Sequence, residues 1–466
     1  MRGISSWGAY LPYRRLDKAG ISSFIGQGGG KGTRTVASFD EDSTTMAVEA
    51  GRIALRHTSA TPTQLLFASV NPTYADKTNA TVVHAALRLD DTALAIDLGS
   101  SVRSAMGGLI LALQSQGVSV VASADIRTGL AGSSEEANGG DAAAAFVIGD
   151  DTHAPLAAEF IGAASATEEF IDRWRAPGTQ RTKTWDEKFS EITYLPLGQR
   201  AWKQALQDAG IQASDVAIVA VSSPSARISS TVAAKLGATK VLDNLSSVIG
   251  LTGAAQPGLL LALLLEQSEP GQIVALVSLT DGADVLLFRT TKHLPQAQPD
   301  TTLAQQLTRG APVSYGRFLS WRTMLAIEPP RRPEPQRVSA TASARSENWK
   351  FGFVGSRDTT TGAVHLPPLR VSADGQRTDN MQDAPMADVL GTIATFTVDR
   401  LAYSPSPPIV FAVVDFDGGG RFPIELCDID AEEIAIGGRV RMTFRRLSVT
   451  DDIPNYFWKA TLVRAS

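Results

Sequence analysis

The chain has 466 residues, with 43 Lys and Arg against 48 Asp and Glu, a formal net charge of −5 at pH 7. This balance gives no basis for a nucleic acid partner, and 43% hydrophobic content over this length allows two or three domains with buried cores. No apolar run reaches the roughly 18 residues that cross a bilayer, and the start lacks a signal-peptide segment. We therefore expect a soluble, cytoplasmic protein without a membrane partner.

The first segment, residues 4–15, reads as a strand that ends in a Tyr-Leu-Pro turn. A glycine-rich loop follows at residues 26–32, with Lys31 inside it and Arg34 just beyond. Such a loop is either a flexible linker or a cup for an anion, in which the two basic side chains contact phosphate. Residues 40–43 (Asp-Glu-Asp-Ser) then precede a helical pattern at residues 46–56, where their carboxylates are expected to cap the helix.

The order of predicted elements then repeats. Residues 44–71 read as helix, turn and buried strand, and residues 195–223 read the same way. Similar turns follow, Ile-Asp-Leu-Gly-Ser-Ser at 96–101 and Leu-Asp-Asn-Leu-Ser-Ser at 242–247, each leading to an apolar helix and a buried strand. Residues 1 to about 290 are therefore predicted to be a duplicated βαβ unit.

Three stretches carry a resemblance to a known family: residues 8–12 (Gly-Ala-Tyr-Leu-Pro), residues 97–110 with their small-residue turn, and residues 140–149 (Gly-Asp-Ala-Ala-Ala-Ala-Phe-Val-Ile-Gly). With the duplicated core, they resemble the thiolase superfamily, in particular archaeal-type hydroxymethylglutaryl-CoA synthases and the related type-three ketoacyl synthases. The resemblance implies an α/β fold of five layers, αβαβα, in which two sheets share a central helix layer.

The resemblance also assigns the catalytic positions, and each carries an unexpected residue. The nucleophilic cysteine corresponds to Val102 and the acid/base glutamate to Val70. The histidine corresponds to Ser222, in Ser-Ser-Pro-Ser-Ala-Arg-Ile, and the ketoacyl synthases' asparagine to Leu251. Because valine neither ionises nor attacks, an acyl-enzyme is not expected.

Four polar residues remain as candidate catalytic groups: Ser222, Ser101, Tyr74 and Asn71. Either they fill space left by a lost triad, or backbone amides near Val102 form an oxyanion hole that stabilises an enolate. Retro-aldol cleavage of a β-hydroxyacyl-CoA needs such a hole and a base, but no covalent thioester. Three basic residues are expected to bind a coenzyme A thioester, the expected ligand: Lys31, Arg34 and Arg227.

The remainder of the chain is predicted to be a second domain. Residues 1–292 form the thiolase-like domain, 293–345 a linker and docking segment, 346–385 a ribbon-like hairpin, and 386–466 a small all-β barrel that resembles an OB-fold. The hairpin resembles the zinc ribbon of OB-fold proteins that accompany acyl-CoA thiolases. Its four cysteine positions hold Asp358, Thr361, Ser372 and Gly375, so no zinc is expected. The single cysteine, Cys427, excludes an internal disulfide and is expected to lie unreactive in the barrel wall.

Three functions remain open: an enzyme that acts on CoA thioesters by non-cysteine chemistry (carbon–carbon bond formation or cleavage, or acyl transfer), a scaffold for a partner thiolase, and a module that binds CoA intermediates. No covalently bound cofactor is expected in any of them. A homodimer is also expected, because residues 118–122 are apolar on both faces and the resemblance implies that such a strand pairs across the two-fold axis.

Overall fold

The computed structural model describes residues 1–179, 181–328 and 331–464. These residues form two compact units. The first contains residues 1–37, 42–81 and 90–322, and the second contains residues 38–41, 82–89 and 323–466. The first unit thus continues to Arg322, beyond residue 292, where the sequence predicts the thiolase-like domain to end.

The first unit is built on ten strands in the order β12-β11-β13-β14-β8-β1-β7-β6-β4-β5. Each half has the same internal order, and the two halves meet at β1 and β8, where only Gly3 and Ile4 pair with Glu159 and Ala158. In each half three strands are parallel and the other two run antiparallel to their neighbours. The predicted duplication is therefore confirmed. The strands are β1 (Arg2–Tyr10), β4 (Gln64–Ser69), β5 (Leu94–Gly99), β6 (Ser119–Asp125), β7 (Ala142–Asp150), β8 (Ala158–Ala166), β11 (Val216–Ser222), β12 (Lys240–Val241), β13 (Ile273–Leu279) and β14 (Ala283–Thr290).

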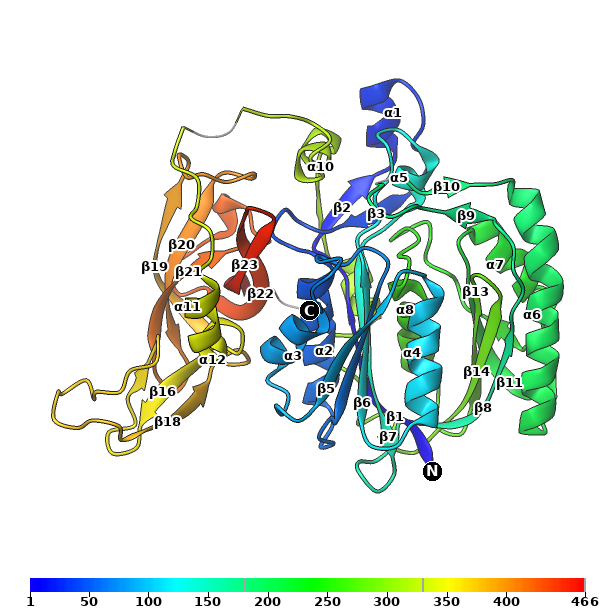
Figure 1. The fold of residues 1–466 in the computed structure, drawn as a ribbon, viewed down its shortest axis with the longest axis horizontal. Coiled ribbons are helices and arrows are strands. Elements are labelled where there is room, and N and C mark those ends of the chain that lie inside the picture. Colours follow the sequence, from blue (N-terminus) through cyan, green and yellow to red (C-terminus); the bar gives the residue numbers. More distant parts are fainter. Residues whose placement is uncertain (180, 329–330, 465–466) are drawn as a thin grey trace. The chain divides into compact units, whose positions relative to one another are not determined.

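Helices cover both faces of these two half-sheets (Figure 1). Helices α4 (Arg103–Gln114) and α8 (Ala255–Glu266) lie between them, since α8 contacts β1, β6 and β7 of one half and β11 and β13 of the other. Helix α2 (Ser43–Arg56) packs on the outer face of the first half, and α6 (Glu187–Ala209) with α7 (Ala226–Ala233) on that of the second. The layers are thus αβαβα, as the resemblance implied.

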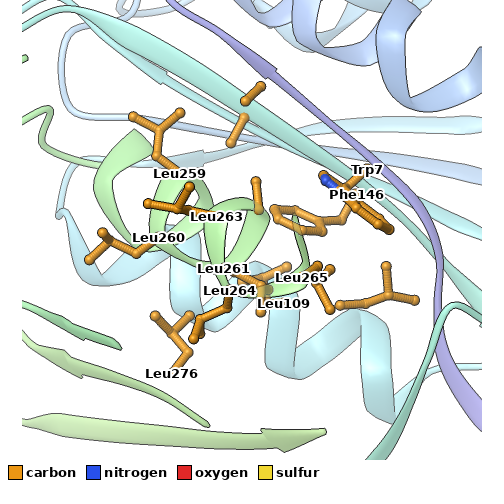
Figure 2. Packing of buried hydrophobic residues seen from close by; sticks show 14 of the residues in the cluster. Trp7, Leu109, Phe146, Leu259, Leu260, Leu261, Leu263, Leu264, Leu265 and Leu276 are labelled. Carbon is orange, nitrogen blue, oxygen red and sulfur yellow. The ribbon is translucent and has the colours of Figure 1, made fainter. Parts of the chain in front are cut away.

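The central helix α8 is apolar on every side because it contacts strands of both halves. Its residues from Ala255 to Leu265 are all buried, and Leu259 to Leu265 pack with Trp7, Phe146 and Leu276 (Figure 2). A Leu to Ala change in such a core costs about 2–5 kcal/mol. On the opposite face of the first half, Gly8 lets β1 approach α2, since a Cβ there would lie 2.3 Å from the Ala50 carbonyl oxygen.

The strand expected at the dimer axis is not at an edge, so this part of the prediction is wrong. Strand β6 lies between β4 and β7, which use its hydrogen-bonding groups on both sides, and its residues are fully buried. The position of a strand in the sheet depends on the whole fold. An apolar strand shows only that its two faces are buried, and not whether it lies at an edge. The edge strands are β5 and β12.

Smaller elements complete the first unit. A three-stranded sheet has the order β15-β2-β3, and a two-stranded hairpin joins β9 to β10. These elements are β2 (Arg14–Asp17), β3 (Thr33–Val36), β9 (Arg173–Trp174), β10 (Lys183–Thr184), β15 (Ala311–Pro312), α1 (Ala19–Ile25), α5 (Ser134–Asn138), η1 (Ala213–Asp215), α9 (Leu303–Thr308) and α10 (Tyr315–Trp321).

The second unit contains a closed five-stranded barrel in the order β19-β20-β21-β23-β22, as expected for an OB-fold. A three-stranded sheet, β17-β16-β18, precedes it in the chain. The elements are α3 (Ala80–Leu87, of which residues 82–87 belong to this unit), α11 (Ala340–Arg345), α12 (Glu347–Lys350), β16 (Val354–Asp358), β17 (Val364–His365), β18 (Met381–Pro385), β19 (Gly391–Asp399), β20 (Ile409–Phe416), β21 (Arg421–Leu426), η2 (Ala431–Glu433), β22 (Arg439–Thr450) and β23 (Ile453–Leu462).

The carboxylates of the acidic run at residues 40–43 have two different roles. Asp42 caps α2 as expected, with its side chain accepting the backbone N–H of Thr45. Asp40 does not cap the helix. It is buried and pairs with Lys459 of the barrel at 2.9 Å, while Glu41 pairs with Arg445 at 3.2 Å. The capping prediction is therefore wrong for these two carboxylates, whose burial beside barrel cations no local pattern indicates.

At the ribbon positions, Asp358 Oδ1 accepts the backbone N–H groups of Thr360 and Thr361, and the Ser372 hydroxyl donates to Asp374. These polar bonds occupy both turns of the hairpin. Within the described residues no helix is both long and apolar enough to cross a membrane. Of the proline-rich residues 328–335, Pro329 and Pro330 lie outside the described residues.

Candidate functional site

A pocket of about 620 Å³ opens in the first unit. It lies beside the end of β11 at Ser222 and the residue that precedes α4, Val102. Both halves contribute to its wall. The lining residues are Lys18, Lys31, Val102, Arg127, Ser134, Glu135, Asn138, Gly139, Asp172, Arg173, Thr184, Trp185, Glu187, Ser190, Ser222, Ser223, Pro224, Ser225, Ala226, Arg227, Ile228, Ser246, Ser247, Leu251, Gly253 and Gln256.

Three of the positions that the resemblance assigns to catalysis meet in this pocket. Val102, Ser222 and Leu251 all line it, although they are as much as 149 positions apart in the chain. Val70 is not among the lining residues, but its backbone N–H is held by Asp125. The described lining contains no histidine and no cysteine.

The turn before Val102 is strained. Ser100 has φ of 96°, in the left-handed region that a residue with a Cβ rarely adopts. Ser101 follows and donates a hydrogen bond to Asp281 Oδ2 at 2.7 Å, and Asp281 also has a positive φ, 49°. Ser101 thus has a carboxylate partner and lies next to the pocket, yet it is not part of the lining.

Backbone contacts join the two halves at the pocket wall. The N–H of Leu251 donates to the Asn138 carbonyl at 2.7 Å, and the N–H of Gly140 donates to the Leu251 carbonyl at 3.1 Å. Glycine is required at residue 140 because a Cβ there would lie 1.8 Å from the Ile249 carbonyl oxygen. The Thr35 hydroxyl also joins the two loops, because it lies 2.7 Å from the Asp141 carbonyl and 3.0 Å from the Ile249 carbonyl as a donor to both.

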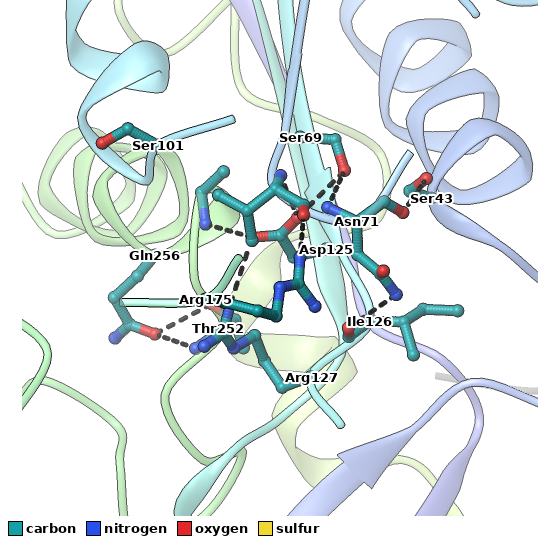
Figure 3. Close-up of polar contacts among 12 residues, drawn as sticks. Ser43, Ser69, Asn71, Ser101, Asp125, Ile126, Arg127, Arg175, Thr252 and Gln256 are labelled. Carbon is teal, nitrogen blue, oxygen red and sulfur yellow. Dashed lines mark hydrogen bonds and ion pairs between the residues drawn. The ribbon is translucent and has the colours of Figure 1, made fainter. Parts of the chain in front are cut away.

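Asp125, at the end of β6, fixes a second pair of loops (Figure 3). Its carboxylate accepts hydrogen bonds from the Ser69 hydroxyl at 2.9 Å, the Val70 N–H at 2.8 Å and the Ala254 N–H at 2.6 Å. Burial raises the pKa of Asp125, although Arg127 at 4.0 Å and the three hydrogen bonds oppose that effect. The carboxylate thus joins the backbone at Val70 in the first half to the backbone at Ala254 in the second.

Arginines form the adjoining part of the wall. Arg127 and Arg173 each pair with Glu135 at 2.8 Å, and these three residues line the pocket. Arg175 is half-buried and donates to the Val70 carbonyl (Figure 3). Burial raises the pKa of Glu135, but the two arginines lower it by more than burial raises it. The net pKa is below the usual value, so the carboxylate is held ionised.

Asp172 is the most enclosed acid of the lining, with only 5% of its surface exposed. The Tyr194 hydroxyl donates to its Oδ2 at 3.0 Å, and Tyr194 in turn accepts the Asp281 N–H at 3.2 Å. Burial raises the pKa of Asp172, while Tyr194 and Arg173 oppose that rise. A chain of bonds thus runs from Asp172 to Tyr194 and Asp281, and on to Ser101.

The predicted ligand-binding cations separate into two groups. Lys31 and Arg227 line the pocket and are exposed, and Arg227 also pairs with Glu191 at 3.3 Å. Arg34 is fully buried and pairs with Asp141 at 3.1 Å, so its predicted role as a phosphate contact is wrong in this structure. The buried carboxylate of Asp141 attracts the guanidinium into the core, which the flexible appearance of the glycine-rich loop conceals. Lys18 lines the pocket in its place, donating to the Ser246 carbonyl at 3.2 Å.

The predicted catalytic residues are also separated. Ser222 lines the pocket, whereas Asn71 and Tyr74 are not among the lining residues. The Asn71 side chain donates to the Ile126 carbonyl at 3.3 Å, and Lys77 lies over the Tyr74 ring at 5.5 Å from its centre. Both are therefore held by local contacts beside the pocket.

Sequence reasoning missed three acids and one aromatic residue that lie in the pocket wall or, for Asp125, hold its loops. Asp125, Glu135, Asp172 and Trp185 belong to no motif of a single spacing, because they come from three separate segments. The only available signal was the acidic and aromatic composition of residues 168–187, a stretch with weak periodicity.

The first unit has a thiolase-like α/β fold. Its solved neighbours include an HMG-CoA synthase complexed with CoA (TM-score 0.60, 17% identity, covering 72% of this chain and 95% of that one). A 3-oxoacyl-(acyl carrier protein) synthase III from Pseudomonas aeruginosa has a TM-score of 0.52 and 23% identity, covering 62% and 98%. At these identities the likeness concerns the fold alone.

Sequence comparison gives a more specific likeness than the fold does. The hydroxymethylglutaryl-CoA synthase of Aeropyrum pernix is 29% identical over 346 residues, 70% of this chain and 95% of the relative. That of Archaeoglobus fulgidus is 28% identical over 353 residues, 69% and 98%. Residues 385–445 match the family model described as ChsH2, C-terminal OB-fold domain. The chain therefore combines a thiolase-like domain that is similar to HMG-CoA synthases with a C-terminal OB-fold domain that is similar to that of ChsH2.

Proposed function

We propose that the first unit binds a coenzyme A thioester in the pocket at Val102 and makes or breaks a carbon–carbon bond in it without forming an acyl-enzyme. The observation that carries the proposal is that Val102, Ser222 and Leu251 line one pocket. The curated relatives are hydroxymethylglutaryl-CoA synthases, and one neighbour of the same fold was solved with CoA. These observations support a thioester site at this position, in which the nucleophile position holds an unreactive side chain.

The charges of the pocket support an anionic ligand. Lys31 and Arg227 are exposed at its surface and Lys18 lies deeper, each on a different segment of the chain. CoA carries phosphates, which such cations attract. The thioester end then extends toward Val102, at the amino end of α4, where the helix dipole favours negative charge on an enolate oxygen.

The side chains favour non-covalent chemistry over acyl transfer through the protein. The Ser101 hydroxyl donates to the Asp281 carboxylate, but the described pocket lining offers no histidine to act as its general base. Cleavage of a β-hydroxyacyl-CoA to a carbonyl compound and a shorter acyl-CoA, or its reverse, needs only enolate stabilisation and a base. We therefore place this retro-aldol class of reaction ahead of acyl transfer.

The alternative is a non-catalytic subunit that binds CoA intermediates for a partner thiolase. The valine at the nucleophile position, Val102, favours it, because a binding subunit has no need of a reactive group. Both functions require CoA binding and both are compatible with a homodimer, but they differ in whether the isolated protein changes a bound thioester.

Titration calorimetry with CoA and acetyl-CoA tests the shared requirement. We expect binding by the intact chain, and at least about tenfold weaker binding by the double variant Lys31→Ala, Arg227→Ala, which loses two phosphate contacts. The control is Lys203→Ala, Lys235→Ala, which removes the same charge from exposed positions outside the pocket. Absence of heat with the folded protein, or equal weakening by the control, contradicts the proposal.

Turnover separates the two functions. The intact chain is incubated with 3-hydroxy-3-methylbutanoyl-CoA or 3-hydroxy-3-methylglutaryl-CoA, and acetyl-CoA release is followed by mass spectrometry. Release supports the enzyme, and tight binding without any conversion of the thioester supports the binding subunit.

A further inference from the structure

Asp172 belongs to the pocket wall, and one oxygen of its carboxylate has no hydrogen-bond partner among the described residues. The residue lines the pocket and is 95% buried, and its Oδ2 accepts the Tyr194 hydroxyl, but its Oδ1 is buried without a hydrogen-bond partner among the described residues. An unsatisfied buried polar atom costs about 1–3 kcal/mol. A group kept in that state inside a pocket calls for a role in ligand chemistry.

The surroundings hold this carboxylate in one orientation. Tyr194 is fully buried on α6, and it is itself fixed by the N–H of Asp281 at 3.2 Å. The backbone carbonyl of Asp172 accepts the N–H of Trp185 at 2.6 Å. This bond joins two residues of the pocket wall that are 13 positions apart in the chain. With Oδ2 bound to Tyr194, Oδ1 is the carboxylate oxygen that makes no hydrogen bond to a described residue.

We infer that Asp172 is the general base of this pocket and that its substrate is a 3-hydroxyacyl-CoA. The inference rests on the proposed function and deepens it, because it supplies the base that the retro-aldol step requires. Among the other lining acids, Glu135 is paired with two arginines, and Glu187 accepts the Ser225 hydroxyl at 2.6 Å. Asp172 alone among these three combines burial with a free oxygen.

The proposed step balances without any further reactant. Oδ1 of Asp172 takes the proton of the 3-hydroxyl group, the C–O bond becomes a carbonyl, and the bond between C2 and C3 breaks. Its electron pair forms the enolate of the shorter acyl-CoA. The carboxylic acid then returns the proton to C2, which yields the acyl-CoA and restores the carboxylate.

The charged groups around Asp172 tune it for this exchange. Burial raises its pKa, the near carboxylate of Asp281 also raises it, and the Tyr194 hydrogen bond and the Arg173 guanidinium lower it. The net rise makes the carboxylate a stronger base than an exposed aspartate while it remains able to lose its proton again.

Proton exchange at C2 tests the inference without knowledge of the natural substrate. The protein is incubated with acetyl-CoA or propanoyl-CoA in D₂O, and deuterium in the thioester is measured by mass spectrometry. We expect exchange by the intact chain and at least about 100-fold slower exchange by Asp172→Asn. The matched control is Asp208→Asn, which removes an exposed carboxylate from α6, the helix that carries Tyr194.

A second variant keeps the test informative if Asp172→Asn fails to fold. Tyr194→Phe removes the hydroxyl that stabilises the charged carboxylate but keeps the ring in the core. The exchange rate should rise with pH as Asp172 ionises, and Tyr194→Phe should move the midpoint of this rise to higher pH. A role in packing alone predicts an unchanged midpoint.

The outcomes separate the two proposals. Loss of exchange in Asp172→Asn with unchanged CoA binding supports the base. Exchange at the wild-type rate in a folded Asp172→Asn overturns it and leaves the proposed function intact. CoA binding by the intact chain without any exchange also overturns the base, whereas absence of CoA binding contradicts the proposed function itself.

Discussion

The backbone N–H of Ala254 donates to Oδ2 of Asp125 at 2.6 Å, so that a carboxylate of the first half holds the loop before α8 in the second. Ala254 directly follows Gly253, which lines the pocket. The pocket is thus assembled by a contact across the duplication, and its shape depends on a residue that is not part of its wall.

Replacement of this carboxylate is expected to affect both stability and binding. Asp125→Ala leaves three buried donors without their acceptor, so we expect the free energy of unfolding to fall by about 3 kcal/mol or more. CoA binding should weaken in parallel, since the loop at Gly253 loses its support. Urea denaturation and calorimetry measure the two effects. Asp208→Ala should leave both unchanged, and a similar loss in that variant would contradict the assignment.

A thiol at the nucleophile position should report on the pocket. We expect Val102→Cys to be alkylated by iodoacetamide, because residue 102 is partly exposed in the pocket and precedes α4, whose amino end favours thiolate. Saturating CoA should slow the reaction at least about tenfold. Mass spectrometry of the intact protein follows both rates.

Wild-type protein is the control for this experiment. Its only cysteine, Cys427, is buried in the second unit, and burial raises the pKa of the thiol well above its usual value. Native wild-type protein should therefore remain unmodified by iodoacetamide, and also by acetyl-CoA. Modification of Cys427 at a rate comparable to that of Val102→Cys would show that the thiol is accessible after all.

The edge strand β5 is expected to form the dimer interface that the sequence placed on β6. It pairs on one side only, with β4, and it exposes Leu94 and Ile96. An apolar edge strand is prone to pair with another chain. We expect Leu94→Arg, Ile96→Arg to convert a dimer to a monomer in analytical ultracentrifugation. Val241→Arg, on the opposite edge strand β12, should leave the dimer intact.

The buried ion pair between Asp40 and Lys459 should make the second unit sensitive to acid. Burial raises the pKa of Asp40, but the positive charges of Lys459 and Arg445 lower it by more than burial raises it. The carboxyl therefore titrates below its usual range. A depressed pKa stabilises the folded unit above the usual aspartate range, and this stabilisation is lost as the pH falls through the folded pKa. Asp40→Asn should cost about 3–5 kcal/mol at pH 7 and progressively less below pH 4.

Hydrogen exchange of peptides from β22 and β23 measures this effect within the second unit. The control is Asp451→Asn, whose exposed pair with Arg337 should contribute less than about 1 kcal/mol. Equal losses of protection at pH 7 and pH 3 in Asp40→Asn would be inconsistent with a titrating pair.

The duplicated layers could be predicted because local patterns encode them. Apolar periodicity marks the helices, and the similar turns at residues 96–101 and 242–247 mark the repeat. The meeting of Val102 and Ser222 in one pocket agrees with the resemblance, which assigns both positions to catalysis. The pairing of Arg34 with Asp141, the interior place of β6 and the enclosure of Asp172 by Tyr194 depend on contacts between distant segments, so no local pattern reports them.

The all-round burial of α8 has a consequence for synthesis of the protein. The strands of the first half are complete at Asp150 and α4 already lies against them, but α8, the second helix of the shared layer, ends at Glu266. At about 5–20 residues per second, the ribosome needs roughly ten seconds to add the intervening segment. During that time α8 does not yet cover the inner face of the nascent first half. We therefore expect a chaperone that binds apolar strands to act mainly in this interval.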